Sequence, residues 1–377
     1  MEFFKEGAFG CVFRPGMNCL GETEGLKYIT KVQMDEKTSD NEINIGKFME
    51  NTIKKQIPTY EDMFAPIIQS CKISLGEIQN ETIKKCEIVQ KNYTVKNFVS
   101  NKIRYVGKYT LKPFLQIELQ NNPILFYKHF FQSHLYLLNS LQILSKYNII
   151  HYDLKENNIS YDDTKRIPVI IDFGLSFRYK EDLVTDFDYE NNFYIYYDKY
   201  PPWCLEIILI SFIVQEFKNM EDLHNTMRAN TLKGKDKGKG KKKRYSSGFW
   251  KNTIVSTEHL IDIVEHYFKN NYVIIDISSK KLINASKKKW ITFINTEFQK
   301  KTGEYIVRFL MKSWDTWDNY SLCVIYLSLS NSLFSNTDKQ KHKLYQQLLI
   351  TNILSTPLER DIPRDTTTKI NAYIQSL

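Results

Sequence analysis

The spacing of hydrophobic positions changes near Pro123 and divides the chain into a strand-rich part and a mainly helical part. Before Pro123, short runs of β-branched and aromatic residues alternate with Gly, Asn and Pro, a pattern typical of strands joined by turns. We expect strands within 10–16, 26–33, 71–78 and 101–109. One helix is expected among them, near Asn41–Asn51, where apolar residues recur at near-helical spacing.

A long amphipathic helix is expected after Pro123. Its apolar side carries Phe126, Phe130, His134, Leu137, Leu138, Leu141 and Leu144. Two short strands follow, at 157–161 and 167–174, and the second is a continuous apolar run of the kind found in buried strands. Beyond Trp203 the pattern is mostly helical. The chain is therefore expected to belong to the α+β class.

Composition places the chain among ordinary globular proteins. Its 377 residues suffice for two or three domains, and the apolar content is 42% and the charged content 25%. The first residues lack the apolar stretch of a secretory signal. The longest apolar runs, such as Leu205–Val214, are shorter than the roughly 20 residues that cross a bilayer. No membrane association is expected.

The formal charge of +9 comes mainly from one tract. Residues Lys233–Arg244 contribute +7, which leaves +2 for the rest of the chain. A tract of this composition cannot bury a core, so we expect disorder over 232–247. Either it is a solvated insertion, or it attracts nucleic acid or an acidic partner electrostatically.

The six cysteines are scattered along the chain and form no Cys-x-x-Cys pair. This spacing favours neither a zinc site nor a disulfide framework, and it fits a reducing compartment. We therefore expect structural, mostly buried thiols at all six positions: Cys11, Cys19, Cys71, Cys86, Cys204 and Cys323.

A cluster of chargeable and amide groups lies between two apolar runs in Asn148–Asp162. Asp153 is placed to accept a hydroxyl proton, and Lys155 to steady a transferring phosphoryl group. Asn158 offers an amide oxygen, and Asp172 opens Asp-Phe-Gly directly after the apolar strand. Mg²⁺ binds through one or two carboxylates together with phosphate oxygens. A surface loop would hold the same residues without any function.

A glycine-bearing stretch, Lys5–Phe13, precedes the first long strand. Glycines allow a backbone to approach phosphates closely, although Gly7 and Gly10 would also suit an ordinary hairpin. Lys31 follows on the next strand and Glu42 on the first helix. Their alternative interpretations are an edge-strand charge and a solvated helix surface.

These motifs, in this order, resemble the signature of eukaryotic-type protein kinases. The match runs through Gly7 and Gly10, Lys31, Glu42, His151–Asn158 and Asp172-Phe173-Gly174. The resemblance implies a bilobal fold, with a small β-rich N-lobe at 1–106 and a large, mainly helical C-lobe at 107–377. A region at 207–312 is longer than the family usually has there. Together with the composition, it is similar to divergent kinases of large DNA viruses.

Two later segments extend the resemblance. Ser313–Leu329 resembles the buried central helix of the large lobe, in which Asp318 would bond to the catalytic loop. Ser355–Asp361 resembles a late Pro-x-x-Arg element, and Glu206 is the expected partner of its Arg360.

The resemblance also implies ATP and Mg²⁺ as cofactors and a protein as substrate. The residues expected to surround the phosphates are Lys5, Gly7, Ala8, Phe9, Gly10 and Val12. Lys31, held by Glu42, would pair with the α- and β-phosphates, and the adenine would lie near Tyr105–Gly107, close to Leu111 and Phe114.

The metal would be held by Asn158 and Asp172. Asp153 and Lys155 would be the catalytic residues, and lysine at 155 resembles the Ser/Thr-specific subclass. A pseudokinase scaffold and a small-molecule phosphotransferase are the alternatives. The expected compartment is the cytoplasm, the host's if the protein is viral, and the basic tract also suits a nuclear address.

The sequence departs from the family pattern at three places. Lys5 occupies the first glycine position. Tyr152 replaces the usual arginine before the catalytic aspartate, so activity is expected without phosphorylation of the activation segment. The spacing from Lys31 to Glu42 is short, which makes Glu36 the alternative partner. Substrate identity and oligomeric state are not encoded in these motifs.

Overall fold

The structure is a computed structural model that describes residues 2–7, 10–20, 22–73, 85–92, 97–180, 187–215 and 249–377. Contacts divide the chain into two compact units, Met1–Lys180 (joined by Leu377) and Glu181–Ser376. The predicted boundary between an N-lobe and a C-lobe, at residue 106, therefore falls inside the first unit. The division into these two lobes stays a prediction. The basic tract predicted at 232–247 lies entirely outside the described residues.

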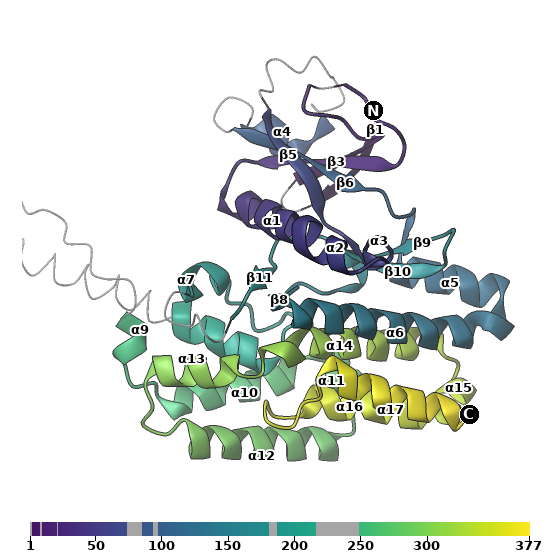
Figure 1. The fold of residues 1–377 in the computed structure, drawn as a ribbon. Helices are drawn as coiled ribbons and strands as arrows, with labels where there is room; N and C mark the ends of the chain where they lie inside the picture. The colour runs from purple at the N-terminus through teal and green to yellow at the C-terminus, as the bar shows by residue number, and fades with distance from the viewer. Residues whose placement is uncertain are drawn as a thin grey trace, which may run out of the picture. The chain divides into compact units, whose positions relative to one another are not determined.

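The first unit is built on a five-stranded antiparallel sheet (Figure 1). The strands lie in the order β1 (Glu2–Gly7), β2 (Gly10–Arg14), β3 (Tyr28–Met34), β6 (Phe98–Arg104) and β5 (Ile67–Ile73). Helix α1 (Lys37–Phe48) packs on β5, continues into a π-helical turn at Met49–Ile53 and ends with the short α2 (Lys54–Gln56). The strands expected at 10–16 and 26–33 and the helix expected near Asn41–Asn51 are confirmed, within shifts of a few residues. β6 covers only the first part of the strand expected at 101–109, and most of the strand expected at 71–78 lies outside the described residues.

Alternation along the strands gives this sheet two different faces. Lys31 on β3 lies opposite Val12 on β2 and Asn101 on β6, so these side chains share the face that looks toward α1. The other face is covered by the short helix α4 (Glu87–Asn92). Its apolar core consists of Cys11, Phe13, Met17, Val32, Cys86, Val89 and Phe98.

The remainder of the first unit consists of two helices and short strands. α5 (Leu111–Asn121) and the long α6 (Pro123–Lys146) follow the sheet. A four-stranded sheet has the order β4 (Phe64–Ala65), β10 (Ile167–Ile171), β9 (Ile159–Asp162) and β7 (Tyr109–Thr110). The short α3 (Tyr60–Met63) precedes β4, and β8 (Ile149–Ile150) pairs with β11 (Phe177–Arg178). The long helix and the strands predicted at 157–161 and 167–174 are thus confirmed.

The second unit is helical in all its described elements. Residues 205–215 form a helix, and the labelled helices are α7 (Tyr189–Asn192), α9 (Phe249–Asn252), α10 (Thr257–Asn270), α11 (Tyr272–Ile277), α12 (Lys280–Glu297), α13 (Gly303–Met311), α14 (Trp317–Leu333), α15 (Asn336–Lys341), α16 (Lys343–Leu354) and α17 (Pro363–Gln375). Helix α14 is buried on nearly every side because apolar and small residues surround its whole circumference. The expected central helix at 313–329 is therefore confirmed. The chain is an α+β protein with a β-rich N-terminal region and a mainly helical C-terminal part.

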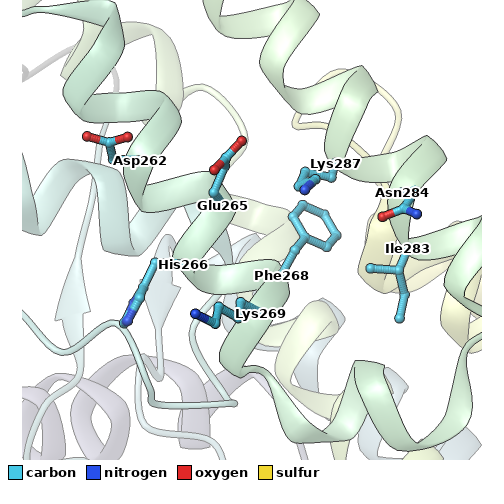
Figure 2. Close-up of a pocket in the computed structure, with 8 residues that line it drawn as sticks. All are labelled: Asp262, Glu265, His266, Phe268, Lys269, Ile283, Asn284 and Lys287. Carbon is cyan, nitrogen blue, oxygen red and sulfur yellow. The ribbon is translucent and has the colours of Figure 1, made fainter.

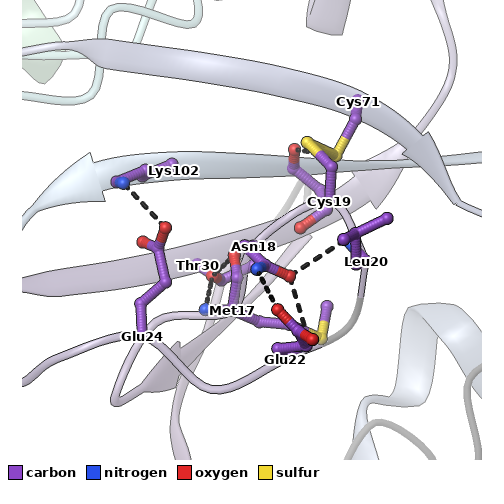
Figure 3. The surroundings of a disulfide bond; sticks show 10 residues. Met17, Asn18, Cys19, Leu20, Glu22, Glu24, Thr30, Cys71 and Lys102 are labelled. Atoms are coloured by element: carbon purple, nitrogen blue, oxygen red, sulfur yellow. Dashed lines mark hydrogen bonds and ion pairs between the residues drawn. A yellow bond between two sulfur atoms is a disulfide. The ribbon is translucent and has the colours of Figure 1, made fainter.

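Four of the six cysteines form disulfides, so the expectation of six free thiols is wrong for them. Cys11 is bonded to Cys86, and Cys19 to Cys71 (Figure 3). The partners are 75 and 52 residues apart in sequence, and only the sheet and α4 bring their Cα atoms to 5.9 and 5.7 Å. Cys204 and Cys323 are free and buried, as expected. With two disulfides present, the cysteines no longer support the expectation of a reducing compartment.

Among the helices that the structure describes, none combines the length and the apolar content that crossing a membrane requires.

Candidate functional site

A cavity of about 250 Å³ lies within the first unit, on the face of the sheet that carries Lys31. It is bordered by β1, β2, β3 and β6, by the segment that joins β6 to β7, by the residues before β9 and by the end of β10 with the residue that follows it. The predicted site residues among those that line it are Gly10, Val12, Lys31, Glu42, Tyr105, Gly107, Asn158 and Asp172. Residues predicted from six separate stretches of sequence therefore share one cavity.

Four further predicted residues are described only by their backbone or lie outside the described residues. Gly7 pairs with Gly10 at the end of the β1–β2 hairpin, and Lys5 pairs with Val12, but these statements concern their backbones alone. Ala8 and Phe9 lie outside the described residues.

Lys31 is the centre of the charged part of the cavity. Its Nζ lies 2.8 and 3.1 Å from the two carboxylate oxygens of Glu42 and 3.1 Å from Oδ1 of Asp172. The Lys31 side chain is 11% exposed and that of Glu42 is 4% exposed. Burial alone would lower the pKa of Lys31, but the two carboxylates together raise it. The ammonium therefore stays charged although its side chain is almost fully buried.

The two carboxylates differ in their surroundings. Burial raises the pKa of Glu42, and Lys31 opposes that rise. Burial also acts to raise the pKa of Asp172, but Lys31 outweighs it and holds this pKa below its ordinary value. The side chain of Asp172 is 42% exposed, so it presents an ionised carboxylate to the cavity. Glu42 instead serves as the buried support of Lys31.

Helix α1 is held in the position that brings Glu42 to Lys31. Glu36 is its N-cap residue, and the Ser39 hydroxyl accepts a hydrogen bond from the Glu36 N–H at 3.1 Å. Asn41 donates its amide N–H to the Ser176 carbonyl at 2.6 Å, which ties α1 to the segment after Asp172. Lys31 contacts the Glu42 carboxylate, whereas Glu36 begins the helix, so the structure selects Glu42 between the two predicted partners.

Asp153 is positioned by the two polar residues that follow it. Lys155 Nζ lies 2.8 and 3.1 Å from its carboxylate oxygens, and Asn158 Nδ2 lies 2.9 Å from its Oδ2 and 2.9 Å from its carbonyl oxygen. Since the Asn158 nitrogen is used in this way, its amide oxygen is the atom left for the cavity. Asp153 and Lys155 are not among the residues that line the cavity, but they contact Asn158, which is.

Aromatic packing fixes the segment around Asp172. Asp172 has a φ of 62°, a left-handed conformation that turns its carboxylate toward Lys31. The next residue, Phe173, is buried in contact with the rings of His151 and Phe64, at centroid distances of 5.0 and 6.4 Å. Tyr152, the residue before Asp153, is buried against Phe177. The position before Asp153 therefore carries no cation.

Two glycines of the cavity wall are required by close backbone contacts. A Cβ atom at Gly107 would lie 2.0 Å from the Tyr161 carbonyl oxygen, and one at Gly10 would lie 2.4 Å from that of Val32. Any side chain at either position would push the linking segment or the hairpin away from its neighbour. The glycine requirement at Gly10 is thus steric, whatever the cavity binds.

Sequence reasoning missed several apolar residues of the cavity. Phe4, Ile29, Ala65 and Ile103 line it and were not predicted. Ile29 could have been found, because it precedes Lys31 by two positions and so shares its face of β3. Ile103 lies opposite Ile29 on β6, and only the strand register places it there. Leu111 and Phe114, which were expected near the adenine, are buried in α5 and do not border the cavity.

A buried ion pair braces the second unit. The Arg360 guanidinium is hydrogen-bonded to the Glu206 carboxylate, and their side chains are 1% and 0% exposed. Arg360 also donates to the Ser355 carbonyl at 3.0 Å, and Ser321 of α14 donates to the Pro202 carbonyl at 2.6 Å. The predicted pairing of Glu206 with Arg360 is confirmed. The bond expected from Asp318 to the catalytic loop stays a prediction.

A second hollow, of about 470 Å³, lies between α10 and α12 in the second unit (Figure 2). Its lining mixes the acidic residues Asp262 and Glu265 with the basic residues Lys269 and Lys287 on helix surfaces. Charges of both signs on exposed positions are typical of solvated helices. This hollow therefore indicates no particular ligand.

The donor set of the first cavity fits a nucleotide with a divalent cation. Asp172 supplies an ionised carboxylate and Asn158 an amide oxygen, which are the hard oxygen ligands that Mg²⁺ prefers. Lys31 is a cation of the kind that binds phosphate oxygens, and Ile29, Ala65 and Ile103 form an apolar wall of the kind that packs against a flat ring.

No protein-family model matches this chain, and no curated protein matches it.

Proposed function

We propose that this chain is an ATP-dependent protein kinase, which transfers the γ-phosphoryl group of Mg-ATP to Ser or Thr hydroxyls of a protein. The observation that carries the proposal is the contact of Lys31 with both Glu42 and Asp172, beside Asn158, in a cavity roofed by the β1–β2 hairpin. These residues come from distant parts of the sequence, and packing alone gives no reason to gather so many charges around one cavity.

The roles of the residues follow from their chemistry. Lys31, oriented by Glu42, binds phosphate oxygens and keeps its charge because two carboxylates stabilise it. Asn158 and Asp172 hold Mg²⁺, which when bound neutralises charge on the phosphate oxygens. Gly10 lets the hairpin lie close to β3 above the phosphates. Phosphoryl transfer depends mainly on such positioning and charge neutralisation.

Asp153 accepts the proton of the acceptor hydroxyl. Its carboxylate is oriented by Lys155 and Asn158, which are 2.8 and 2.9 Å away. The Lys155 side chain is 38% exposed, so it can leave Asp153 and approach a phosphoryl group when substrates bind. Lysine at this position supports a Ser/Thr acceptor, as the family resemblance suggests.

Activity is proposed to be independent of phosphorylation of the activation segment. In the family, an arginine before the catalytic aspartate receives the activating phosphate, and here Tyr152 is packed against Phe177 instead. Replacing every Ser, Thr and Tyr between Leu175 and Tyr200 by Ala should leave turnover unchanged. Loss of turnover in a folded variant would contradict this expectation.

A radiolabel transfer assay with purified protein, Mg-ATP and generic protein acceptors tests the proposed function. Asp153→Asn should reduce transfer by at least 10²-fold, as expected for loss of a general base. Phosphoamino-acid analysis of the product should give phosphoserine and phosphothreonine. Equal transfer by wild type and Asp153→Asn would instead indicate a scaffold without catalysis.

A second arm of the assay offers small hydroxylated molecules in place of proteins. Transfer to these alone would favour a small-molecule phosphotransferase. The site of action remains part of the proposal: the cytoplasm, or the nucleus through the basic tract. Binding of nucleic acid or an acidic partner by Lys233–Arg244, which lies outside the described residues, remains a prediction.

A further inference from the structure

The Cys11–Cys86 disulfide lies directly behind the wall of the cavity. Gly10 and Val12 line the cavity from β2, and Cys11 lies between them. Because side chains alternate along a strand, Cys11 points to the opposite face of the sheet. There it is fully buried and bonded to Cys86, in the apolar core that also contains Val89 of α4.

A second contact ties the other strand of the hairpin to the same helix. Glu6 of β1 accepts hydrogen bonds at its Oε1 from the backbone N–H groups of Glu87 and Ile88, at 3.1 and 3.3 Å. These are the first residues of α4. Both strands of the β1–β2 hairpin are thus attached at the start of α4. β2 is bonded covalently to Cys86, the residue before the helix, and β1 is bound through the Glu6 carboxylate to the first residues of the helix.

Within the residues that the structure describes, the hairpin joins the sheet along one side. β1 is the edge strand and pairs with β2, β2 joins the sheet through β3, and the Phe4 ring also contacts the Tyr105 ring at a centroid distance of 6.2 Å. Phe4 of β1 borders the cavity and is 45% exposed. Attachment to α4 therefore restricts how far the hairpin can lift from the cavity.

We propose that the Cys11–Cys86 disulfide and Glu6 are positioning groups, which hold the hairpin over the cavity and thereby set its affinity for nucleotide. This inference rests on the proposed function, because it assumes that the cavity binds a nucleotide. A nucleotide binds only to the closed hairpin, so its apparent dissociation constant rises as the closed fraction falls. A closed fraction of about one tenth would raise that constant about tenfold.

Nucleotide affinity should then depend on whether the Cys11–Cys86 disulfide is oxidised or reduced. A dithiol reductant would supply two electrons and two protons. The Sγ–Sγ bond would break, Cys11 and Cys86 would each gain an S–H, and the dithiol would be oxidised to its cyclic disulfide. Because Cys11 and Cys86 are fully buried, a dithiol reaches this bond only when α4 opens locally.

The Cys19–Cys71 disulfide provides a matched control. It joins the loop after β2 to β5, on the side of the sheet away from the cavity, where Lys102 and Glu24 also pair at 2.8 Å (Figure 3). Its partners are 52 residues apart, compared with 75 for Cys11 and Cys86, so the two bonds restrict the unfolded chain to a similar degree. Neither Cys19 nor Cys71 lines the cavity.

The experiment measures the dissociation constant of Mg-ADP by titration calorimetry on the full chain. The samples are oxidised wild type, Cys11→Ala/Cys86→Ala and Cys19→Ala/Cys71→Ala. We expect about tenfold weaker binding in the first variant and less than a twofold change in the second. In turnover assays, the first variant should show a raised KM for ATP with unchanged kcat. Equal affinity of wild type and the first variant, or equal weakening in both variants, would overturn the inference.

Substitution of Glu6 gives an independent test that leaves both disulfides intact. It tests the attachment of the hairpin to α4 even if Cys11→Ala/Cys86→Ala fails to fold. Glu6→Ala should weaken Mg-ADP binding, and Glu6→Gln, which keeps an oxygen acceptor, should restore most of it. Equal affinity of Glu6→Ala and wild type would overturn the role of Glu6. Absence of nucleotide binding by oxidised wild type would instead refute the proposed function, and the inference with it.

Discussion

Removing one partner of the buried Arg360–Glu206 pair should destabilise the second unit strongly, and more than removing both partners together. The two side chains are 1% and 0% exposed, so water cannot solvate a charge that loses its partner. Removing one member of a buried pair typically costs about 3–5 kcal/mol. We expect this loss of unfolding free energy for Glu206→Met and for Arg360→Met alike.

The double variant distinguishes the pair from two independent residues. Two independent losses would add, whereas a buried pair replaced by apolar residues of similar length is often close to neutral. We therefore expect the double Met variant to be more stable than either single variant, with a coupling free energy of about 3 kcal/mol or more. Part of the loss should remain, because Arg360 also bonds to the Ser355 carbonyl.

Tryptophan fluorescence during urea unfolding is a suitable assay. All five tryptophans lie between residues 203 and 317, so their emission reports on the second unit alone. The exposed pair Arg308–Glu304, with side chains 43% and 35% exposed, is the control, and its removal should cost less than about 1 kcal/mol. A loss below about 1 kcal/mol in Glu206→Met, or strictly additive losses in the double variant, would refute the reasoning.

Three further predictions concern the first unit. Glu42→Gln removes the charge that orients Lys31. It should lower kcat/KM for ATP by about 10- to 100-fold, which corresponds to the free energy of one charge-assisted hydrogen bond. An unchanged kcat/KM in the transfer assay would show that the contact between Glu42 and Lys31 does not contribute to activity. Burial lowers the pKa of His134 to about 3, so below about pH 6.5 the unfolded state binds more protons and the first unit loses stability as the pH falls. Compared with His134→Leu, wild type should lose about 1.4 kcal/mol of unfolding free energy per pH unit between pH 6 and 4, measured by hydrogen exchange in α6. The same dependence of unfolding free energy on pH in both proteins would contradict this prediction. When the folded protein is titrated with a dithiol, the Cys19–Cys71 disulfide, whose Cys19 is exposed, should be reduced before the buried Cys11–Cys86 disulfide. Mass spectrometry after alkylation measures the order of reduction, and the opposite order would contradict the prediction.

Much of the candidate site could be predicted because its residue types recur at short spacings within single segments. Asp153, Lys155 and Asn158 lie on one loop, so their mutual hydrogen bonds follow from local sequence. The apolar strand before Asp172 also fixed where that carboxylate emerges. The sequence could not decide between Glu36 and Glu42, because that choice depends on where α1 begins.

The amino-acid sequence by itself determined the elements of this protein and the chemistry they carry. Hydrophobic periodicity is local, so it defined the strands before Pro123, the long helix after it and the polar loop between two apolar runs. Tertiary structure alone decided which distant residues meet. It paired Cys11 with Cys86 and Cys19 with Cys71 across 75 and 52 residues, where scattered spacing had suggested free thiols. It also placed unpredicted apolar residues around the cavity, because strand register and sheet order are set by the packing of the whole unit.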